Sequence, residues 1–346
     1  MFPLQYRALI GVGGVGTGQF FHLNGNQTLG REESRSGHFL NRRDYCKLHI
    51  IAHYVQRLLG PRFTTIPISS IGADEAGRQL RREMQSTGLD LRYLLEDPTL
   101  PTLFSFCFQY PDGSGGNLTT DVSAAYAVTP QDVIASQPEF ARFTGRGIAL
   151  AAPESPPEVR STLMRLGVQH QFFCVVALTS AETVCEWAVD LLRQADLVAL
   201  NLEEAARFAH VDMATLPPED IVHAAVAALR SLNNKLKISI TAGSLGSWSW
   251  DGDDIHFVSA SSVPVVNTAG AGDAHLAGIL AGLAWGLPMR HAQEVGNLVA
   301  AQSVTSPHTI HPEIRASELW PFASLIQAPI TEAVKHVIIE LAKKSG

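Results

Sequence analysis

The stretch VVNTAGAGDAHLAGILAGLAWG (265–286) decides the fold class, because it joins an apolar β-branched run to a long helical pattern through a loop almost without side chains. The first backbone N–H groups of a helix have no partner within the helix, and the helix dipole adds partial positive charge there. Gly270, Ala271 and Gly272 would let an anion approach those groups closely. Asp273 follows directly, so one small volume would contain both an anion site and a carboxylate.

This combination suits phosphoryl transfer, which requires positioning, charge stabilisation and a group that orients the nucleophile. Asp273 could take a proton from a hydroxyl while the neighbouring N–H groups hold the phosphoryl group that the oxygen attacks. The simpler interpretation is a helix with an acid in its first turn, which adds a few tenths of a kcal/mol up to about one. The stretch alone leaves both interpretations open.

Outward from this stretch, apolar runs alternate with helical patterns. Strands are predicted at 8–13, 63–70, 102–110, 147–152, 172–178, 197–201, 236–242, 255–260 and 263–266. Helices are predicted at 44–59, 74–87, 156–166, 181–194, 203–209, 219–233, 273–285, 290–305 and 330–344. Several strands are almost continuously apolar, as in a parallel sheet covered on both faces. We therefore expect residues 1–346 to form one α/β domain, doubly wound around a mostly parallel central sheet.

Two segments break the alternation. Residues 17–41 are polar, Gly-rich and charged, and residues 102–121 read as a strand followed by a hairpin tip, YPDGSGGNLTTD. Together they could form a small β-lid over one end of the sheet. Ordinary surface loops are the alternative.

The bulk composition excludes several classes of protein. The chain is 46% hydrophobic and 17% charged with a net charge of −7, and it has no long basic run, so we expect no nucleic-acid partner. The apolar segment 274–287 is too short to span a bilayer, and the start of the chain lacks a signal-type pattern, so we expect a cytoplasmic protein without a membrane contact. The four cysteines form no C-x-x-C, and the histidines form no H-E-x-x-H.

Five segments then point to one family. They are GADEAGRQLRREMQSTGLDL (72–91), ADLVALNLEEA (195–205), ITAGSLGSWSW (240–250), NTAGAGDAHLAG (267–278) and NLVAAQSVTS (297–306). In this order they resemble the motifs of the ribokinase-like (PfkB-type) carbohydrate kinases, whose C-terminal signature is D-T-x-G-A-G-D. The resemblance covers roughly residues 63–310. It implies an ATP-dependent kinase that phosphorylates a hydroxyl of a small sugar-like acceptor.

The resemblance also implies roles for individual residues. Asp273 would be the catalytic base, and the amides of Gly270, Ala271 and Gly272 the anion hole. Asn201 and Glu204 would act on Mg²⁺, largely through water, as this cation dehydrates reluctantly. The nucleotide would be lined by Thr241, Gly243 and Gly246, with Asn297 near the adenine. A helix N-cap is the alternative for Asn201 and Glu204, and a tight hairpin is the alternative for the glycines.

The N-terminal part departs from the family. Thr17 and Gln19 stand where the family has an acid that holds acceptor hydroxyls, and the Asp that opens the signature is Asn267 here. Of the family's next Gly-rich segment, only Gly37 and Asn41 remain. Arg31 and Arg35 lie in the same region, and Arg42 and Arg43 follow it, so we hypothesise an anionic acceptor held by guanidinium groups. A solvated lid surface is the alternative.

Other functions remain open. GVGGVG (11–16) matches the G-x-G-x-x-G of NAD-binding Rossmann proteins, although TGQFFHLNGNQTLG (17–30) lacks the helical period that this motif requires. A ribokinase-like protein that binds nucleotide with weak or no turnover is a second alternative, because fold does not fix function. Members of the resembled family often dimerise through the lid, so a homodimer is also expected.

Overall fold

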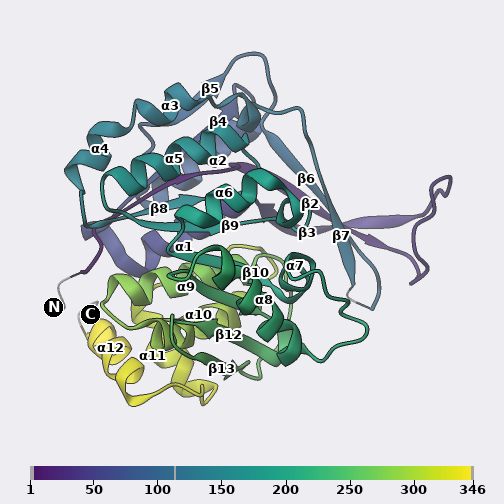
Figure 1. Ribbon diagram of the computed structural model, residues 1–346. Coiled ribbons are helices and arrows are strands. Elements are labelled where there is room, and N and C mark those ends of the chain that lie inside the picture. Colours follow the sequence, from purple (N-terminus) through teal and green to yellow (C-terminus); the bar gives the residue numbers. More distant parts are fainter. Residues whose placement is uncertain (1–3, 113, 344–346) are drawn as a thin grey trace.

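A nine-stranded sheet forms the centre of the computed structural model, which describes residues 4–112 and 114–343 (Figure 1). The strand order is β13-β12-β11-β10-β9-β8-β1-β4-β5. The strands are β1 (Ala8–Val12), β4 (Thr64–Gly72), β5 (Leu94–Asp97), β8 (Gly147–Ala151), β9 (Phe173–Ala177), β10 (Leu197–Asn201), β11 (Lys237–Thr241), β12 (Gly246–Trp250) and β13 (Ile255–Ser259). All neighbours pair in parallel except β11–β12 and β12–β13, which are antiparallel.

Helices cover both faces of this sheet, and each face has its own apolar core. One core includes Leu9 and is covered by α1 (Lys47–Leu59), α2 (Glu75–Thr87), α9 (Ala271–Ala284), α10 (Met289–Ser303), α11 (Ala316–Leu325) and α12 (Glu332–Lys343). The other includes Ile10 and is covered by α3 (Pro130–Ile134), α4 (Gln137–Arg142), α5 (Pro157–Gln169), α6 (Glu186–Gln194), α7 (Leu202–Phe208) and α8 (Pro218–Leu232). Successive residues of a strand point to opposite faces, which explains why these strands are continuously apolar. The predicted fold class is confirmed.

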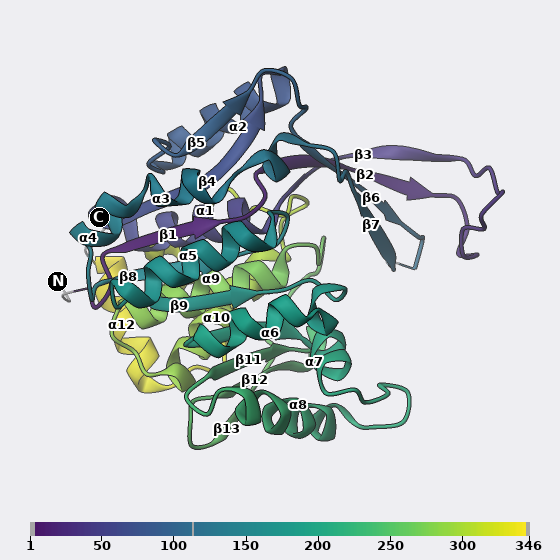
Figure 2. The same cartoon turned by 45° about the horizontal axis from the view of Figure 1, so that its top comes forward.

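A second, four-stranded sheet, which we call the lid sheet, extends away from the body (Figure 2). Its strands, in the order β3-β2-β6-β7, are β3 (Gly37–Tyr45), β2 (Gly16–Leu23), β6 (Leu103–Gln109) and β7 (Gly115–Thr119). β2 pairs with β6 in parallel, and the outer pairs are antiparallel. The turn between β2 and β3 forms the far end of this sheet in Figure 2.

The structure differs from the expectations in several elements. Residues 263–266 are not a strand: Pro264 has no N–H to donate, and the side chains of Val265 and Val266 are 62% and 41% exposed. The helix predicted from residue 44 begins at Lys47, because β3 continues to Tyr45. Strand β12 was not predicted, although four of its five residues are buried. Residue 113 of the predicted hairpin and residue 344 of the last predicted helix lie outside the described residues.

Within 4–112 and 114–343, no helix is both long and apolar enough to cross a membrane. The apolar segment 274–287 lies largely within α9, a helix of 14 residues between Gly270 and Trp285. Its residues 274–284 are all buried against α1 and α10. The hydrophobicity of this segment is therefore that of a core helix.

Candidate active site

A cavity of about 370 Å³ lies between the lid sheet and the loops at the carboxyl ends of the central strands. The body contributes Lys47 from the start of α1, Glu154 from the loop after β8, and Gly270 and Asp273 from the start of α9. The lid sheet contributes a second wall, made of Phe20, Asp44, Tyr45, Cys107, Phe108, Gln109, Gly115, Gly116 and Asn117. Ligands of open α/β sheets bind at this end of the strands.

The start of α9 presents free backbone donors. Gly270 precedes the helix with a φ of 77°, a left-handed conformation that favours glycine. The N–H of Ala271 donates to the carbonyl of Thr268 at 3.2 Å, whereas no acceptor is recorded among the described residues for the N–H groups of Gly272 and Asp273. A Cβ added to Gly272 would meet no atom within 4 Å, so the space beside these donors is open. Of the three amides predicted for the anion hole, that of Ala271 is engaged within the protein, whereas no acceptor is recorded for the N–H of Gly270 or Gly272 among the described residues.

Asp273 faces Lys47. The Lys47 ammonium lies 3.8 Å from Asp273 Oδ1, and the two side chains are 31% and 14% exposed. Burial raises the pKa of Asp273 above its usual value, and the nearby Lys47 opposes this shift without cancelling it. Burial alone would lower the pKa of Lys47, but Asp273, Glu204 and Glu154 together raise it. Lys47 is therefore the cationic centre around which three carboxylates are arranged.

Glu154 is a site residue that the sequence interpretation missed. Its φ is 65°, and its Oε2 atom is buried without a hydrogen-bond partner. Burial raises its pKa from 4.5 to about 7, although Cys46 and Lys47 act in the opposite direction. A Cβ on Gly14 would lie 2.4 Å from this Oε2, so the glycine leaves the space that the carboxyl group occupies. The available signal was its position: an acid three residues after the apolar strand 147–151.

Asn201 and Glu204 form a capping box at the start of α7. Asn201 Oδ1 accepts from the N–H of Glu204, and Glu204 Oε2 accepts from the N–H of Asn201, each at 2.8 Å. The alternative N-cap interpretation is thus present in the structure. Glu204 is nevertheless 5% exposed; burial raises its pKa, and Lys47 acts against that shift. Because the box uses Oε2, Oε1 stays available, and carboxylate and amide oxygens are ligands that suit a hard cation.

No group of three or more His, Cys, Asp or Glu side chains that could hold a metal ion occurs in the part of the chain that the structure describes. A protein site of one carboxylate and one amide fits Mg²⁺ that keeps most of its water. It does not fit a metal that needs a complete protein cage.

The predicted nucleotide residues lie at the end of β11, in the turn that leads into β12, and on α10. Thr241 ends β11 beside Asn201, its partner in the parallel register. Gly243 and Gly246 have φ values of 54° and 125°, and a Cβ on Gly246 would lie 2.2 Å from Val258 O, so the hairpin itself requires glycine there. Asn297 accepts from Ser247 Oγ at 2.7 Å and donates to Val258 O at 3.0 Å. None of these four residues lines the cavity that contains Asp273.

The predicted acceptor arginines lie outside the cavity. Arg31 and Arg35 belong to the loop between β2 and β3 at the far end of the lid sheet, where Arg35 pairs with Glu33. Asn41 lines a different groove, between β3 and α2. Gly37 begins β3, where a Cβ would lie 2.1 Å from His22 O. The structure therefore does not bring these four residues to Asp273, because the hairpin extends away from the body.

The GVGGVG segment also lacks the context of a dinucleotide fingerprint. Gly16 begins strand β2 rather than a helix. A Cβ on Gly11 would lie 2.7 Å from Leu48 Cδ1, and a Cβ on Gly13 would lie 2.8 Å from Ala152 Cβ. These glycines allow α1 and the loop after β8 to pack against β1. The structure thus contradicts the Rossmann interpretation.

Comparisons with known proteins agree with this architecture. Residues 51–316 match the model of the "pfkB family carbohydrate kinase". A segment is 46% identical over 56 residues to the "Uncharacterized sugar kinase YegV" of Escherichia coli, which is 16% of this chain and 17% of that protein. The match therefore spans about a sixth of that relative's length.

Two solved structures share the fold over nearly their whole length. The Burkholderia thailandensis nucleoside kinase, solved with inosine, has a TM-score of 0.73 at 16% identity, covering 92% of this chain and 98% of its own. Arabidopsis thaliana ribokinase, solved with ribose and ATP, has a TM-score of 0.70 at 17% identity, covering 98% and 99%. At these identities the likeness concerns the fold.

Proposed function

The chain belongs to the pfkB family of carbohydrate kinases, and on that premise we propose that it transfers the γ-phosphoryl group of ATP to a hydroxyl of a sugar-like acceptor in the cavity beside Asp273. The observation that carries the proposal is the pairing of a carboxylate only 14% exposed with backbone donors that have no recorded acceptor at the start of the same helix. An acid needed only to stabilise the helix would stay exposed and would not require an open space beside it.

In the proposed reaction, Asp273 takes the proton of the acceptor hydroxyl as its oxygen attacks the γ-phosphorus. The bond from that phosphorus to the bridging oxygen breaks, and ADP leaves with those electrons. The N–H groups of Gly272 and Asp273 stabilise the charge on the transferred group. Lys47, 3.8 Å from Asp273 Oδ1, favours the ionised form of the base and so opposes the effect of burial on its pKa.

The donor side rests on the strands beside this helix. Asn201 and Glu204 would hold Mg²⁺ through water, and the bound cation would neutralise phosphate charge. Thr241 and the loop with Gly243 and Gly246 would border the phosphates, because β10 and β11 end side by side. We assign Asn297 to the wall of the nucleotide site rather than to direct contact, since both ends of its amide are engaged within the protein.

The acceptor is proposed to be neutral. The cavity lining contains Asp44, Glu154 and Asp273 but one cationic side chain, Lys47. A further anion would add repulsion that the distant arginines of the lid loop do not relieve. Sugars, polyols and nucleosides therefore fit the cavity better than sugar acids or phosphates.

We also propose a homodimer formed through the lid sheet. On the face opposite Asp44, the rings of Phe21, Phe39 and Phe106 contact one another, with centroids 5.1–6.2 Å apart. Phe39 is 59% exposed, and Leu118, the register partner of Phe106, is 62% exposed. An apolar surface of this kind on a β-sheet favours association with a second copy.

The test is a phosphate-transfer screen. Wild-type protein and the Asp273→Asn variant are incubated with Mg²⁺–ATP and a panel of sugars, sugar acids, nucleosides and polyols, and acceptor phosphate is measured. We expect transfer to a neutral member, reduced about 10²–10⁴-fold in the variant with nucleotide affinity retained. Nucleotide binding without transfer to any member would instead favour a binding protein of this fold.

A further inference from the structure

Asp44 stands out in the cavity wall, because it is a carboxylate on the lid sheet to which neither catalysis nor nucleotide binding assigns a role. It is the last residue but one of β3, and it is 6% exposed. In the register of the lid sheet, Gly18 of β2 is opposite Asp44 on one side and Ser105 of β6 on the other. Residues in one register row share a face of the sheet, and this face lines the cavity.

The glycine in the middle of this row makes the carboxylate's position possible. A Cβ on Gly18 would lie 2.0 Å from Ser105 Oγ and 2.9 Å from Asp44 Cβ. Because Gly18 has no side chain, Asp44 and Ser105 meet across the central strand, β2. Asp44 Oδ2 accepts from the hydroxyl of Ser105 and from the thiol of Cys107, the latter at 3.2 Å. Both donors bind the same oxygen, so the carboxylate is oriented while Oδ1 has no recorded donor among the described residues.

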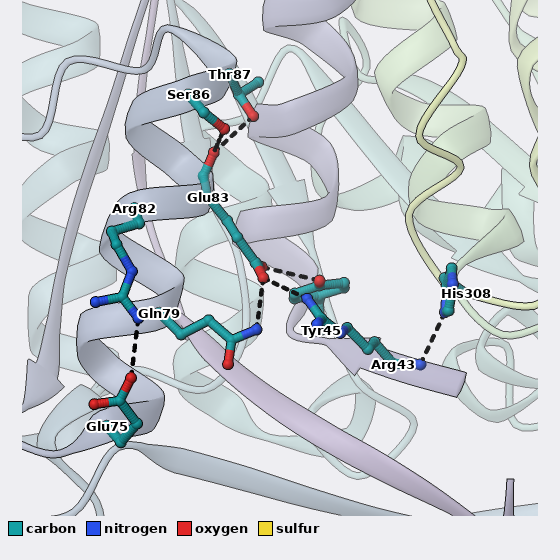
Figure 3. A network of polar contacts seen from close by, with 9 residues as sticks. All are labelled: Arg43, Tyr45, Glu75, Gln79, Arg82, Glu83, Ser86, Thr87 and His308. Atoms are coloured by element: carbon teal, nitrogen blue, oxygen red, sulfur yellow. Dashed lines mark hydrogen bonds and ion pairs between the residues drawn. The ribbon is translucent and has the colours of Figure 1, made fainter. Parts of the chain in front are cut away.

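The neighbours of Asp44 anchor its backbone to the body (Figure 3). Arg43 and Tyr45 point to the opposite face of the sheet, where both contact Glu83 of α2, the tyrosine hydroxyl donating at 2.9 Å. The N–H of Arg43 donates to His308 Nδ1 at 3.1 Å, and the N–H of Thr309 donates to Arg43 O at the same distance. Side-chain alternation then directs Asp44 toward the cavity from a fixed position.

The charge of Asp44 has no counter-ion of its own. Among the described residues, no lysine, arginine or histidine forms an ion pair with it. A carboxylate so little exposed is costly unless donors satisfy it. Both donors reach Oδ2, so Oδ1 is free to accept from a ligand in the cavity. The lining of the same cavity also includes Glu154, whose Oε2 atom is buried, and the base Asp273. Neutral hydroxyl groups are the ligands that would donate to such a set without adding charge.

We infer that Asp44 binds the acceptor, accepting a hydrogen bond through Oδ1 from a hydroxyl other than the one that is phosphorylated. The inference rests on the proposed kinase function and specifies its substrate class: a neutral compound with at least two hydroxyl groups, one at Asp273 and one at Asp44. Sugar acids and phosphorylated sugars are disfavoured by the same carboxylate.

The experiment measures acceptor binding by titration calorimetry in the presence of Mg²⁺ and a non-hydrolysable ATP analogue. The probes are ribose, inosine, their single-deoxy analogues, and the matching sugar acid, ribonate. Wild type is compared with Asp44→Asn and with Asp112→Asn, a control Asp on the exposed turn between β6 and β7. Thermal unfolding and ADP affinity report whether each variant is folded.

We expect the wild type to bind a neutral probe better than ribonate, and Asp44→Asn to weaken that binding about 10–100-fold. The analogue that lacks the hydroxyl at Asp44 should bind the wild type more weakly than the parent compound does. In Asp44→Asn the same two compounds should bind with similar affinity, because the hydrogen bond to this hydroxyl is already lost. Asp112→Asn should behave as wild type. Ser105→Ala, which removes one donor to Asp44 but keeps its carboxylate, should lower affinity only a few fold.

The inference is overturned if Asp44→Asn binds the neutral probes as the wild type does, or if every deoxy analogue loses the same affinity in both proteins. Wild-type binding of none of the neutral probes, or of ribonate alone, overturns it as well. A general loss of Tm and ADP affinity in Asp44→Asn, shared by Ser105→Ala, would make Asp44 a structural residue. Normal acceptor binding with no phosphate transfer would instead contradict the kinase function and leave the inference intact.

Discussion

At the scale of single residues, the site is organised by one ammonium among carboxylates. Lys47 lies 3.8 Å from Asp273 Oδ1 and acts electrostatically on Glu204 and Glu154. Burial pushes the pKa values of all three carboxyl groups upward, and Lys47 pulls each one down. Protonation of the base and the charge of the cation site are therefore linked through one side chain.

The first prediction concerns the pH dependence of turnover. A base with a raised pKa loses activity as pH falls through that pKa, so kcat/KM should have an acidic limb above the usual range of aspartate. Lys47→Met removes the group that lowers this pKa, so the limb should move to higher pH. Its kcat should fall as well. Lys335→Met, which breaks an exposed ion pair with Glu332, is the control. A limb that stays in place in Lys47→Met would contradict the pairing.

The second prediction concerns stability. Glu154 has a pKa of about 7 when folded against 4.5 for its usual value, so the folded protein binds this proton more tightly than the unfolded chain. The stability contributed by this group is greatest below pH 4.5 and is lost as pH rises toward 7. Glu154→Gln should remove this pH-dependent loss. Between pH 5 and pH 8, the free energy of unfolding should therefore fall by roughly 1–3 kcal/mol less in the variant than in the wild type.

Urea unfolding at the two pH values measures this difference. Glu203→Gln, at an exposed pair with Arg207 on α7, is the control and should leave the pH dependence of the free energy of unfolding unchanged. Equal pH dependence in wild type and Glu154→Gln would show that Glu154 titrates normally.

At the scale of elements, the start of α9 combines two glycines with opposite requirements. Gly270 has a φ of 77°, and its Cβ would lie 3.0 Å from Thr309 O, so it needs to be glycine for the backbone. Gly272 has helical geometry and nothing within 4 Å of its Cβ position, so the fold does not require glycine there. The absence of a side chain at 272 then matters for what enters the open space.

This contrast gives a paired prediction. Gly270→Ala should lower the free energy of unfolding by about 1–2 kcal/mol, since alanine is strained in the left-handed conformation. Gly272→Ala should be as stable as wild type or up to about 1 kcal/mol more stable, because it loses less backbone entropy. Its turnover should nevertheless fall, as the methyl group would occupy the space beside the free amides. Thermal unfolding and phosphate-transfer assays separate the two effects. Unchanged turnover in Gly272→Ala would show that the amide of Gly272 is not part of the anion site.

The elements of the body could be predicted because their signals are local. Apolar runs fixed strands such as β8 and β10, and the small-residue pattern of 273–285 corresponds to the buried helix α9. The prediction at 263–266 was wrong because β-branched residues also occur in exposed loops, and only pairing makes a strand. The helix predicted over 44–59 began three residues before α1, because Asp44 and Tyr45 pair with β2 and so extend β3, a contact that the local pattern does not show.

At the scale of the whole molecule, the protein consists of a body that holds catalytic groups and a lid sheet that completes the cavity (Figure 2). Polar contacts join the two parts at Arg43, whose backbone contacts His308 and Thr309 and whose side chain contacts Glu83. The lid sheet therefore has one anchored end, at β3, and one free end, at the turn between β2 and β3.

The last prediction concerns the free face of the lid sheet. Phe39→Asp together with Leu118→Asp should convert a dimer into a monomer in sedimentation velocity, because charges would replace the most exposed apolar side chains of the face. Leu325→Asp, which changes an 81% exposed leucine on α11, should remain dimeric. A double variant that still dimerises would show that the dimer contact lies elsewhere. A monomeric wild type would contradict the proposed dimer.

The parts of the site that the sequence did not indicate are those built by long-range pairing. Asp44 meets Ser105 and Cys107 across 61 and 63 residues, and Arg43 meets His308 across 265. No local pattern encodes such contacts. The arginines at 31 and 35 were assigned to the acceptor because sequence proximity to the lid was taken for spatial proximity to the cavity. Asp273, by contrast, was recognisable because the loop and helix that position it are adjacent in sequence.

A single residue, Cys46, separates the end of β3 from the first residue of α1. A displacement of β3, the strand that carries Asp44, would thus also displace Lys47. Changes of substrate preference that evolve or are engineered through β3 will carry a cost in catalytic power. β7 offers a more permissive route, because Asn117 borders the same cavity on a strand at the edge of its sheet, without a catalytic group behind it.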